Sequence, residues 1–259
     1  MTAYNSIGHQ YNNTRTADPL IAQTLYDLLK PQPDGVYLDI GCGTGNYTAA
    51  LANMGVHLHG IDPSNVMLDE AKAKSNAVQW HIGTAENIAF SDAFFDGALA
   101  TLTLHHWESM DKGFVELYRV LKPQSRMVIF AALSDLTEKF WLKHYFPKML
   151  EASTKKEPKY SALVSAVEGA GFKIASTQKY FVQDDLQDKF LFVGKNNPNL
   201  YFDAQLRSGI SSFAQLSLKE EVATGLEKLK ADIDSGAFEN IHRQYHSTDG
   251  DYMFIVIEK

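Results

Sequence analysis

The sequence predicts a doubly wound α/β fold built on a mostly parallel β-sheet. Short apolar segments alternate with segments of helical periodicity through the first half of the chain, a pattern typical of right-handed strand–helix–strand crossovers. The apolar segments are hydrophobic on both sides, as expected for strands that helices cover on both faces. Glycine and proline residues separate these segments at short intervals and indicate where each element ends.

The first 132 residues divide into clearly bounded elements. Asp18-Pro19 is typical of a helix N-cap followed by proline at the first helical position, and this helix stops before Pro31. Ser64 can cap a later helix, and Pro123 is expected to end another. The expected strands span 36–40, 56–61, 78–82, 97–104 and 126–132. The expected helices between them span 46–54, 64–74 and 111–121.

The second half of the chain is less regular. Four side chains have the spacing of one helix face: Phe140, Trp141, His144 and Tyr145. The later elements are expected to be a helix over 160–170, a strand over 172–181, a mostly helical stretch over 184–230 and a strand over 252–257. The sheet would then have seven strands, with a helical insertion before the last. The expected parts are a core with an N-terminal cover (1–183), a helical lid over the acceptor site (184–250) and the last core strand (251–259).

Composition excludes several functional classes. The chain has 259 residues, 45% hydrophobic and 21% charged, which is typical of a globular protein. Its net charge of −7 argues against a nucleic-acid partner, because duplex binding needs a cationic face. One cysteine excludes an internal disulfide, and nine histidines without metal-ligand spacing predict no metal site. No apolar run reaches the ~18 residues of a membrane span, and the N-terminus lacks an apolar signal core, so we expect a cytoplasmic monomer or homodimer.

The most informative segment is a glycine-rich turn after the first expected strand. Glycines at 41, 43 and 45 allow a sharp bend, and the following helix points its positive end at the same place. A dinucleotide turn requires G-x-G-x-x-G, but Asn46 and Thr48 stand where its third glycine would fall. Asp62, at the end of the second strand, can accept both hydroxyls of a ribose, which suits nucleosides of either cofactor class.

Five segments, in this order and spacing, resemble the class I S-adenosylmethionine-dependent methyltransferases. They are Leu38–Gly45, Gly60–Ser64, Gly83–Glu86, Leu102–Trp107 and Leu117–Pro123. The resemblance covers roughly residues 5–132 and implies the Rossmann-like methyltransferase fold. It also implies S-adenosyl-L-methionine as cofactor and a small-molecule methyl acceptor as partner.

The resemblance implies where the methyl donor would bind. Asp39 and the glycine turn would hold its methionine part, and Asp62 its ribose. The positions it implies as donor contacts are Tyr11, Arg15, Asp39, Gly41, Cys42, Gly43, Asn46, Asp62, Pro63, Ser64, Met67, Thr84, Ala85, Glu86, Thr101 and Leu102. Arg15 could pair with the donor's carboxylate. Thr84 stands where many relatives carry aspartate, and a hydroxyl makes a weaker contact with the adenine than a charged acceptor does.

The acceptor side is less defined by the sequence. His105 and His106 are candidate catalytic bases, as is His144, and the alternative is that they are ordinary loop histidines. Tyr201, Arg207 and Ser211, with Ser212, form a basic and hydroxyl-bearing patch that could bind an anionic part of the acceptor. Three functions therefore compete: a small-molecule methyltransferase, a regulatory protein that binds the donor without catalysis, and a nicotinamide-dependent oxidoreductase.

Overall fold

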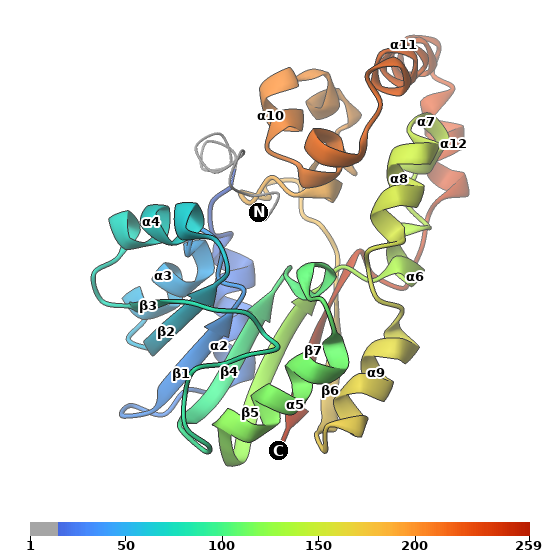
Figure 1. Cartoon of the computed structure of the whole chain (residues 1–259). Coiled ribbons are helices and arrows are strands. Elements are labelled where there is room, and N and C mark those ends of the chain that lie inside the picture. The colour runs from blue at the N-terminus through green and yellow to red at the C-terminus, as the bar shows by residue number, and fades with distance from the viewer. Residues whose placement is uncertain (1–14) are drawn as a thin grey trace.

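The computed structural model describes residues 15–259, and their core is a seven-stranded sheet with helices on both faces (Figure 1). The strand order is β3-β2-β1-β4-β5-β7-β6, in which the pairs from β3 to β5 are parallel and β7 is antiparallel to both of its neighbours. The strands are β1 (Val36–Ile40), β2 (His57–Asp62), β3 (Gln79–Ile82), β4 (Phe95–Thr101), β5 (Leu121–Ala131), β6 (Lys173–Tyr180) and β7 (Tyr252–Glu258). The predicted doubly wound, mostly parallel sheet is confirmed.

Two helices of the core, α2 and α4, begin at side-chain caps that the sequence indicated. Asp18 accepts hydrogen bonds from the backbone amides of Leu20 and Ile21, and Ser64 accepts one from Met67. The core helices are α2 (Pro19–Leu29), α3 (Asn46–Asn53), α4 (Asn65–Lys74), α5 (Met110–Val120) and α9 (Tyr160–Gly169). These bounds agree with the predicted helices to within a few residues.

Side chains of β5 show why the sheet needs helices on both faces. Val128 and Phe130 belong to the apolar cluster under α2, whereas Met127 and Ile129 belong to the cluster under α5 and α9. Successive strand residues point to opposite faces, so a strand that is apolar throughout is buried on both. All four side chains are inaccessible to solvent.

The fourth strand ends three residues earlier than predicted. β4 stops at Thr101, and Leu102 adopts φ 52°, which no strand residue does. The 3-10 turn η2 (Leu104–His106) follows. The run of apolar residues therefore continues past the sheet because Leu104 is buried in the turn, not because the strand continues.

Pro123 does not end the fifth helix. α5 ends at Val120, and β5 begins at Leu121, which pairs with Phe95 before a bulge shifts the register to Gly97 and Arg126. The proline lies inside this early part of the strand. The sequence could not show this pairing because it depends on a partner strand more than 20 residues away.

The segment between β6 and β7 is less helical than predicted. Residues 184–190 form no helix, and only α11 (Lys219–Ser235) is long. The remaining elements are η3 (Leu191–Gly194), η4 (Pro198–Phe202), α10 (Ala204–Ser208), η5 (Ser212–Leu216) and α12 (Phe238–Gln244). Aromatic packing overrides helix formation here, since Phe190, Phe192, Tyr201 and Phe213 are all buried in one apolar cluster.

Residues 134–154, between β5 and β6, form three short helices, so the aromatic residues over 140–145 do not share the face of one helix. These helices are α6 (Ser134–Thr137), α7 (Leu142–Tyr145) and α8 (Pro147–Thr154). Phe140 and Trp141 precede α7, yet both are buried with Tyr145, while His144 remains partly accessible. Figure 1 shows these helices together with α10 and α11 beyond the upper end of the sheet.

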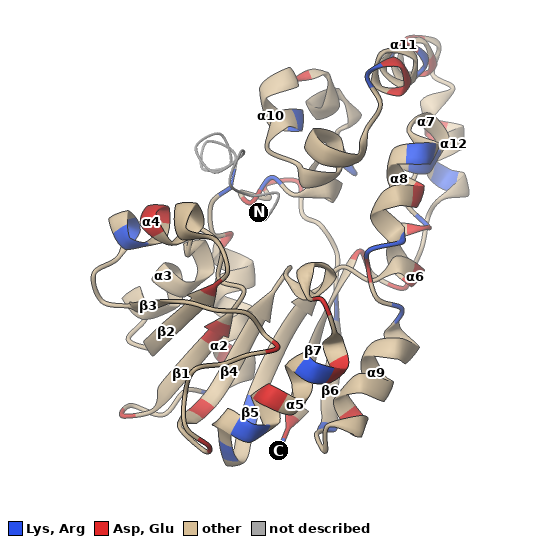
Figure 2. Cartoon of the chain, viewed as in Figure 1, with Lys and Arg blue, Asp and Glu red and all other residues tan. Residues whose placement is uncertain are grey.

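Charged residues are spread over the helices, and in Figure 2 lysine and arginine residues lie among aspartate and glutamate residues. Within residues 15–259, every helix is too short or too polar to cross a bilayer.

A histidine pair lies under the edge of the sheet, away from the turn after β1. His59 Nδ1 and His81 Nε2 are 3.0 Å apart, and the two rings stack with Phe90, Phe94 and Phe95 around them. A hydrogen bond between two ring nitrogens needs one protonated and one bare nitrogen, so at most one of the two rings carries a charge. Burial lowers the pKa of both histidines, and the charge of His81 lowers the pKa of His59 further.

We predict that this pair makes the fold less stable in mild acid. An unfolded histidine titrates near pH 6.5, and the folded pair titrates lower, so the stabilisation is complete above pH ~6.5 and is lost as pH falls. Replacing His81 with phenylalanine should reduce the loss of unfolding free energy between pH 7 and pH 5, measured by urea denaturation. The exposed His57 of the same strand is the control, and H57Q should leave the slope unchanged. Equal slopes for wild type and H81F would contradict the prediction.

Candidate functional site

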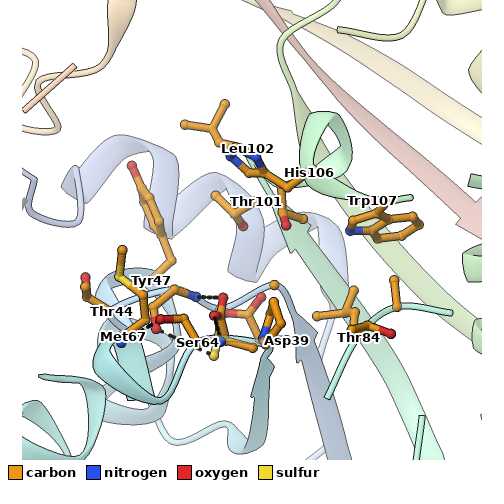
Figure 3. Close-up of a pocket in the computed structure, with 18 of the residues that line it drawn as sticks. Asp39, Thr44, Tyr47, Ser64, Met67, Thr84, Thr101, Leu102, His106 and Trp107 are labelled. Carbon is orange, nitrogen blue, oxygen red and sulfur yellow. Dashed lines mark hydrogen bonds between the residues drawn. The ribbon is translucent and has the colours of Figure 1, made fainter. Parts of the chain in front are cut away.

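A cavity of about 340 Å³ opens at the carboxyl ends of β1, β2 and β4. This is the edge at which open α/β sheets bind their ligands. Of the sixteen predicted donor contacts, fifteen line this cavity, and Tyr11 lies outside the described residues. Figure 3 shows its side chains, with His106 and Leu102 on the opposite side of the view from Met67 and Ser64. Segments that are far apart in sequence, from Arg15 to Gln215, thus meet at one place.

Two positions of the turn after β1 require glycine, each for a different reason. Gly41 has φ +73°, and a Cβ there would lie 1.9 Å from Thr103 Oγ1. Any other residue would therefore collide with the segment after β4 as well as strain the backbone. Gly43 also has positive φ, but a Cβ at that position would meet no atom within 4 Å, so only its backbone conformation requires glycine.

Asp62 joins the turn to the end of β2 and the start of α4. Its Oδ2 accepts a hydrogen bond from the Gly43 amide at 2.9 Å, and its Oδ1 accepts one from the Ser64 amide at 2.9 Å. A carboxylate has about four lone-pair positions, so each oxygen keeps one for a further donor. Burial raises the pKa of Asp62, and both amide hydrogen bonds oppose that shift. Asp62 can therefore fix the turn and still accept two hydroxyl groups.

Asp39 presents a buried carboxylate oxygen to the same cavity. Its Oδ2 accepts a hydrogen bond from Thr48 Oγ1 at 2.6 Å, but its Oδ1 has no hydrogen-bond partner within the described part of the chain. Burial raises the pKa of Asp39 to about 6, and the charge of Asp62 adds to this, while the Thr48 bond opposes it. An unpaired buried carboxylate oxygen is costly, so this position suits a cationic ligand group such as an ammonium.

The far wall of the cavity is apolar, with polar groups already engaged by the protein. Met67 and Ala85 are buried, and Trp107 lines the cavity beside them. Glu86 Oε1 accepts a hydrogen bond from the Ser109 amide at 3.1 Å, so the Glu86 carboxylate orders the loop before α5. Thr84 forms an isolated bridge with Asn87. This wall suits a flat aromatic group bounded by backbone atoms.

The cover of the cavity comes from the segment before α2 and the segment after β6. Arg15 donates from Nε and Nη2 to the carboxylate of Asp188, which is 1% exposed, and Tyr47 donates its hydroxyl to Asp188 Oδ2 at 3.0 Å. Asp18 accepts a hydrogen bond from the Gln187 amide at 3.0 Å. The Arg15 guanidinium therefore pairs with Asp188, and its pairing with a donor carboxylate stays a prediction.

Asn46, another predicted donor contact, connects the turn to this cover. Its side-chain nitrogen donates to the Arg15 carbonyl at 3.1 Å, and its oxygen accepts from Lys74 at 2.7 Å. The Asn46 amide thus holds the cover and α4 in place at the cavity rim.

A second, smaller cavity of about 80 Å³ adjoins the first. It shares with the first five lining residues: Arg15, Leu102, His106, Lys156 and Gln215. Half of its own lining is apolar or aromatic, including Phe190, Leu191 and Tyr252, and the other half is polar, including His105 and Glu157.

The two predicted catalytic histidines lie at these cavities with shifted pKa values. Burial and the nearby Lys156 charge lower the pKa of His106 to about 4. Burial, His106 and Lys156 lower the pKa of His105 well below its usual range. Both rings are therefore neutral at pH 7. His144, the third candidate, lies on α7 and lines neither cavity.

The predicted acceptor patch is not brought together. Tyr201 is fully buried, and its hydroxyl donates to the Leu191 carbonyl at 2.5 Å. Arg207 donates to the Tyr201 carbonyl, and neither residue lines either cavity. Ser211 does line the smaller cavity, next to Ser212. Tyr201 and Arg207 thus hold the insertion together, and neither is positioned to contact an acceptor in these cavities.

Several cavity residues were not found from the sequence. Tyr47 and Trp107 lie in or next to predicted motifs, so proximity to those motifs was a usable signal. Lys156, Asp188 and Gln215 come from the less regular half of the chain and reach the cavity only through the tertiary structure.

Comparisons with known proteins agree with this geometry. Residues 38–129 match the family model described as a methyltransferase domain. An Anabaena variabilis crystal structure, assigned as a methyltransferase from an antibiotic biosynthesis pathway, is 32% identical with a TM-score of 0.83. The alignment covers 94% of this chain and 98% of that one. A geranyl diphosphate C-methyltransferase from Streptomyces coelicolor, solved with S-adenosyl-L-homocysteine, shares the fold alone, with 13% identity, a TM-score of 0.57, and coverage of 92% of this chain and 75% of that one.

Curated relatives match over shorter stretches. An O-methyltransferase from Aspergillus sclerotiorum is 36% identical over 36% of this chain and 38% of its own length. A ubiquinone/menaquinone biosynthesis C-methyltransferase from Rubrivivax gelatinosus is 30% identical over 45% of each chain. The matches thus span less than half the length of these curated relatives. With the full-length structural match and the fold, they establish that this chain belongs to the class I S-adenosylmethionine-dependent methyltransferases.

Proposed function

We propose that this protein transfers a methyl group from S-adenosyl-L-methionine to a small-molecule acceptor. The observation that carries the proposal is the pairing of two carboxylates at one cavity, where Asp39 has an oxygen without a partner in residues 15–259 and Asp62 keeps acceptor capacity on both oxygens. An amino acid linked to a nucleoside needs a carboxylate at each end. The failed dinucleotide spacing and the family membership both weigh against a nicotinamide cofactor.

Different residues of the cavity would bind different parts of the donor. Asp39 would hold the α-ammonium, and Asp62 would accept hydrogen bonds from the ribose hydroxyls. Met67, Ala85 and Trp107 would enclose the adenine. The donor supplies a methyl group on a positively charged sulfur, which makes that methyl group reactive toward a nucleophile.

The protein's contribution to the reaction is positioning and exclusion of water. The reacting atom must lie about 3–3.5 Å from the methyl group and in line with the bond that breaks. Thr101 and Leu102 line the donor cavity at the end of β4, and Leu102 also lines the smaller cavity. The Arg15–Asp188 pair closes the donor side by joining the segment before α2 to the segment after β6. The smaller cavity thus has the place of an acceptor site, and residues 184–250 act as its lid.

Donor binding should depend on Asp62, the carboxylate proposed to accept hydrogen bonds from the ribose hydroxyls. Replacing Asp62 with alanine removes two hydrogen bonds to a charged acceptor, each worth about 1.5–3 kcal/mol, and should weaken S-adenosylhomocysteine binding at least ~100-fold. Isothermal titration calorimetry measures this effect. The control is D69A, which removes an exposed carboxylate from the neighbouring helix α4. Unchanged affinity in D62A would remove the basis of the donor site.

A second prediction follows from the raised pKa of Asp39. Only the ionised carboxylate attracts an ammonium, so S-adenosylhomocysteine affinity should be constant above pH ~7 and should fall as pH drops through about 6. The expected loss approaches tenfold per pH unit below that value. Calorimetry from pH 5 to pH 8 tests it, with D39N expected to bind weakly and without this pH dependence. Parallel curves for D39N and wild type would contradict the assignment.

A third experiment separates an enzyme from a donor-binding regulator. The protein is incubated with S-adenosylmethionine that carries a labelled methyl group and with a panel of small phenols, carboxylic acids and amines. We expect transfer of label to at least one acceptor, and none with D62A at the same donor concentration. Donor binding without transfer to any compound would favour a regulatory protein, and preferential binding of NAD would favour an oxidoreductase.

A further inference from the structure

The boundary between the two cavities is the place where methyl transfer would occur, which rests on the proposed function. A donor in the larger cavity and an acceptor in the smaller one can touch only where the cavities meet. Gln215 and Lys156 line both cavities, and so does His106. The chemistry of these side chains therefore selects the atom that receives the methyl group.

Gln215 offers a hydrogen-bond donor at this boundary. It lies in η5, a single π-helical turn, and such turns occur frequently at functional sites. Its side-chain nitrogen is buried and finds no hydrogen-bond partner among residues 15–259. Because burying an unpaired donor is costly, a ligand oxygen is the natural partner for the Gln215 amide.

Lys156 adds positive charge at the same boundary. Its ammonium group forms no ion pair with any residue that the structure describes. The Lys156 charge helps to lower the pKa of both His105 and His106. Neutral imidazoles that resist protonation are poor proton acceptors at pH 7, so neither histidine is suited to deprotonating a weakly acidic alcohol.

Among residues 15–259, no carboxylate that lines these cavities lies at the boundary to neutralise the Lys156 charge. Asp188 is paired with Arg15 and Tyr47. Glu157 lines only the smaller cavity, where Ser153 donates to its Oε1 at 3.4 Å, and burial raises its pKa to about 7. The other cavity carboxylates line the larger cavity alone. At the boundary itself, an amine acceptor, which arrives as an ammonium, would therefore meet donors and a cation, because Glu157 lines the smaller cavity but not the larger one.

We propose that the acceptor is a small apolar compound with an acidic hydroxyl group that reacts as its oxyanion, held by the Gln215 amide and the Lys156 ammonium. The hydroxyl proton leaves to solvent when the acceptor binds. The oxyanion forms an oxygen–carbon bond with the methyl group, and the electron pair of the broken sulfur–carbon bond stays on sulfur. A sulfonium and an oxyanion are thereby converted into a neutral thioether and a neutral methyl ether or ester.

The smaller cavity fits the body of such a compound. Its apolar wall is formed by Ala132, Phe190, Leu191, Leu216 and Tyr252. Glu157 and the hydroxyl-bearing Ser153 and Ser211 also line it and would face the part of the acceptor away from the reacting oxygen.

The test uses 4-nitrophenol as probe with the protein saturated in S-adenosylhomocysteine. The visible absorbance of 4-nitrophenolate reports the ionisation of the bound probe directly, without turnover. We expect its apparent pKa to fall by about one unit on binding, a tenfold stabilisation of the oxyanion. Benzoate should also bind, whereas 4-nitrobenzyl alcohol and 4-nitrobenzylamine should bind at least about tenfold more weakly than nitrophenolate.

Variants assign the effect to the two side chains. Gln215→Glu replaces the amide donor by a carboxyl group of the same shape, and Lys156→Met removes the charge. Each should weaken nitrophenolate binding about tenfold or more and raise its bound pKa toward the value in water. The control is Lys159→Met, an exposed lysine that lines neither cavity.

The outcomes separate the inference from the proposed function. Failure of the wild-type protein to bind S-adenosylhomocysteine would overturn the proposed function. Normal S-adenosylhomocysteine binding without preference for nitrophenolate, including no binding of any probe, would overturn the oxyanion site alone. Stronger binding of the amine would have the same meaning, and so would unchanged nitrophenolate binding in both Gln215→Glu and Lys156→Met.

Discussion

The candidate site depends on one buried carboxylate, that of Asp62. Its two oxygens accept hydrogen bonds from the amides of Gly43 and Ser64, so a single side chain fixes the glycine turn after β1 against the start of α4. The backbone adds to this link, since the amides of Gly41 and Cys42 both donate to the Ile61 carbonyl. Each amide bond to a carboxylate offsets part of the cost of burying the charge. This one arrangement therefore positions the glycine turn and the start of α4, which together form the floor of the cavity.

The cover of the cavity, which is its roof, is held by contacts between residues that are far apart in the chain. Arg15, Tyr47 and Asp188 come from three distant parts of the chain, and their contacts close the donor side of the cavity. An ion pair buried to this degree requires both partners to be hydrogen-bonded, because an uncompensated charge would be expensive. The floor thus depends on local sequence, whereas the roof depends on packing of the insertion onto the sheet.

The smaller cavity shows how neighbouring charges set chemical roles. Lys156 and burial keep His105 and His106 neutral, although histidine ordinarily titrates close to physiological pH. Gln215 and Lys156 supply hydrogen-bond donors where the two cavities meet. Under the proposed function, such an environment favours selection of an acceptor by stabilising negative charge on it, more than by removing its proton with a strong base.

The sequence by itself determined the sheet, its helices and the cavity floor. Apolar strands and caps such as Asp18 and Ser64 act through neighbours within a few residues, and the glycines of the turn have a characteristic spacing, so the sequence alone reveals these patterns. The tertiary structure alone decided that β5 begins at Leu121, that aromatic packing shortens the helices of the insertion, and that Tyr201 is a core residue. It also decided that Lys156, Asp188 and Gln215 reach the cavity. Such contacts join residues far apart in the chain, and no local pattern encodes which distant surfaces will pack together.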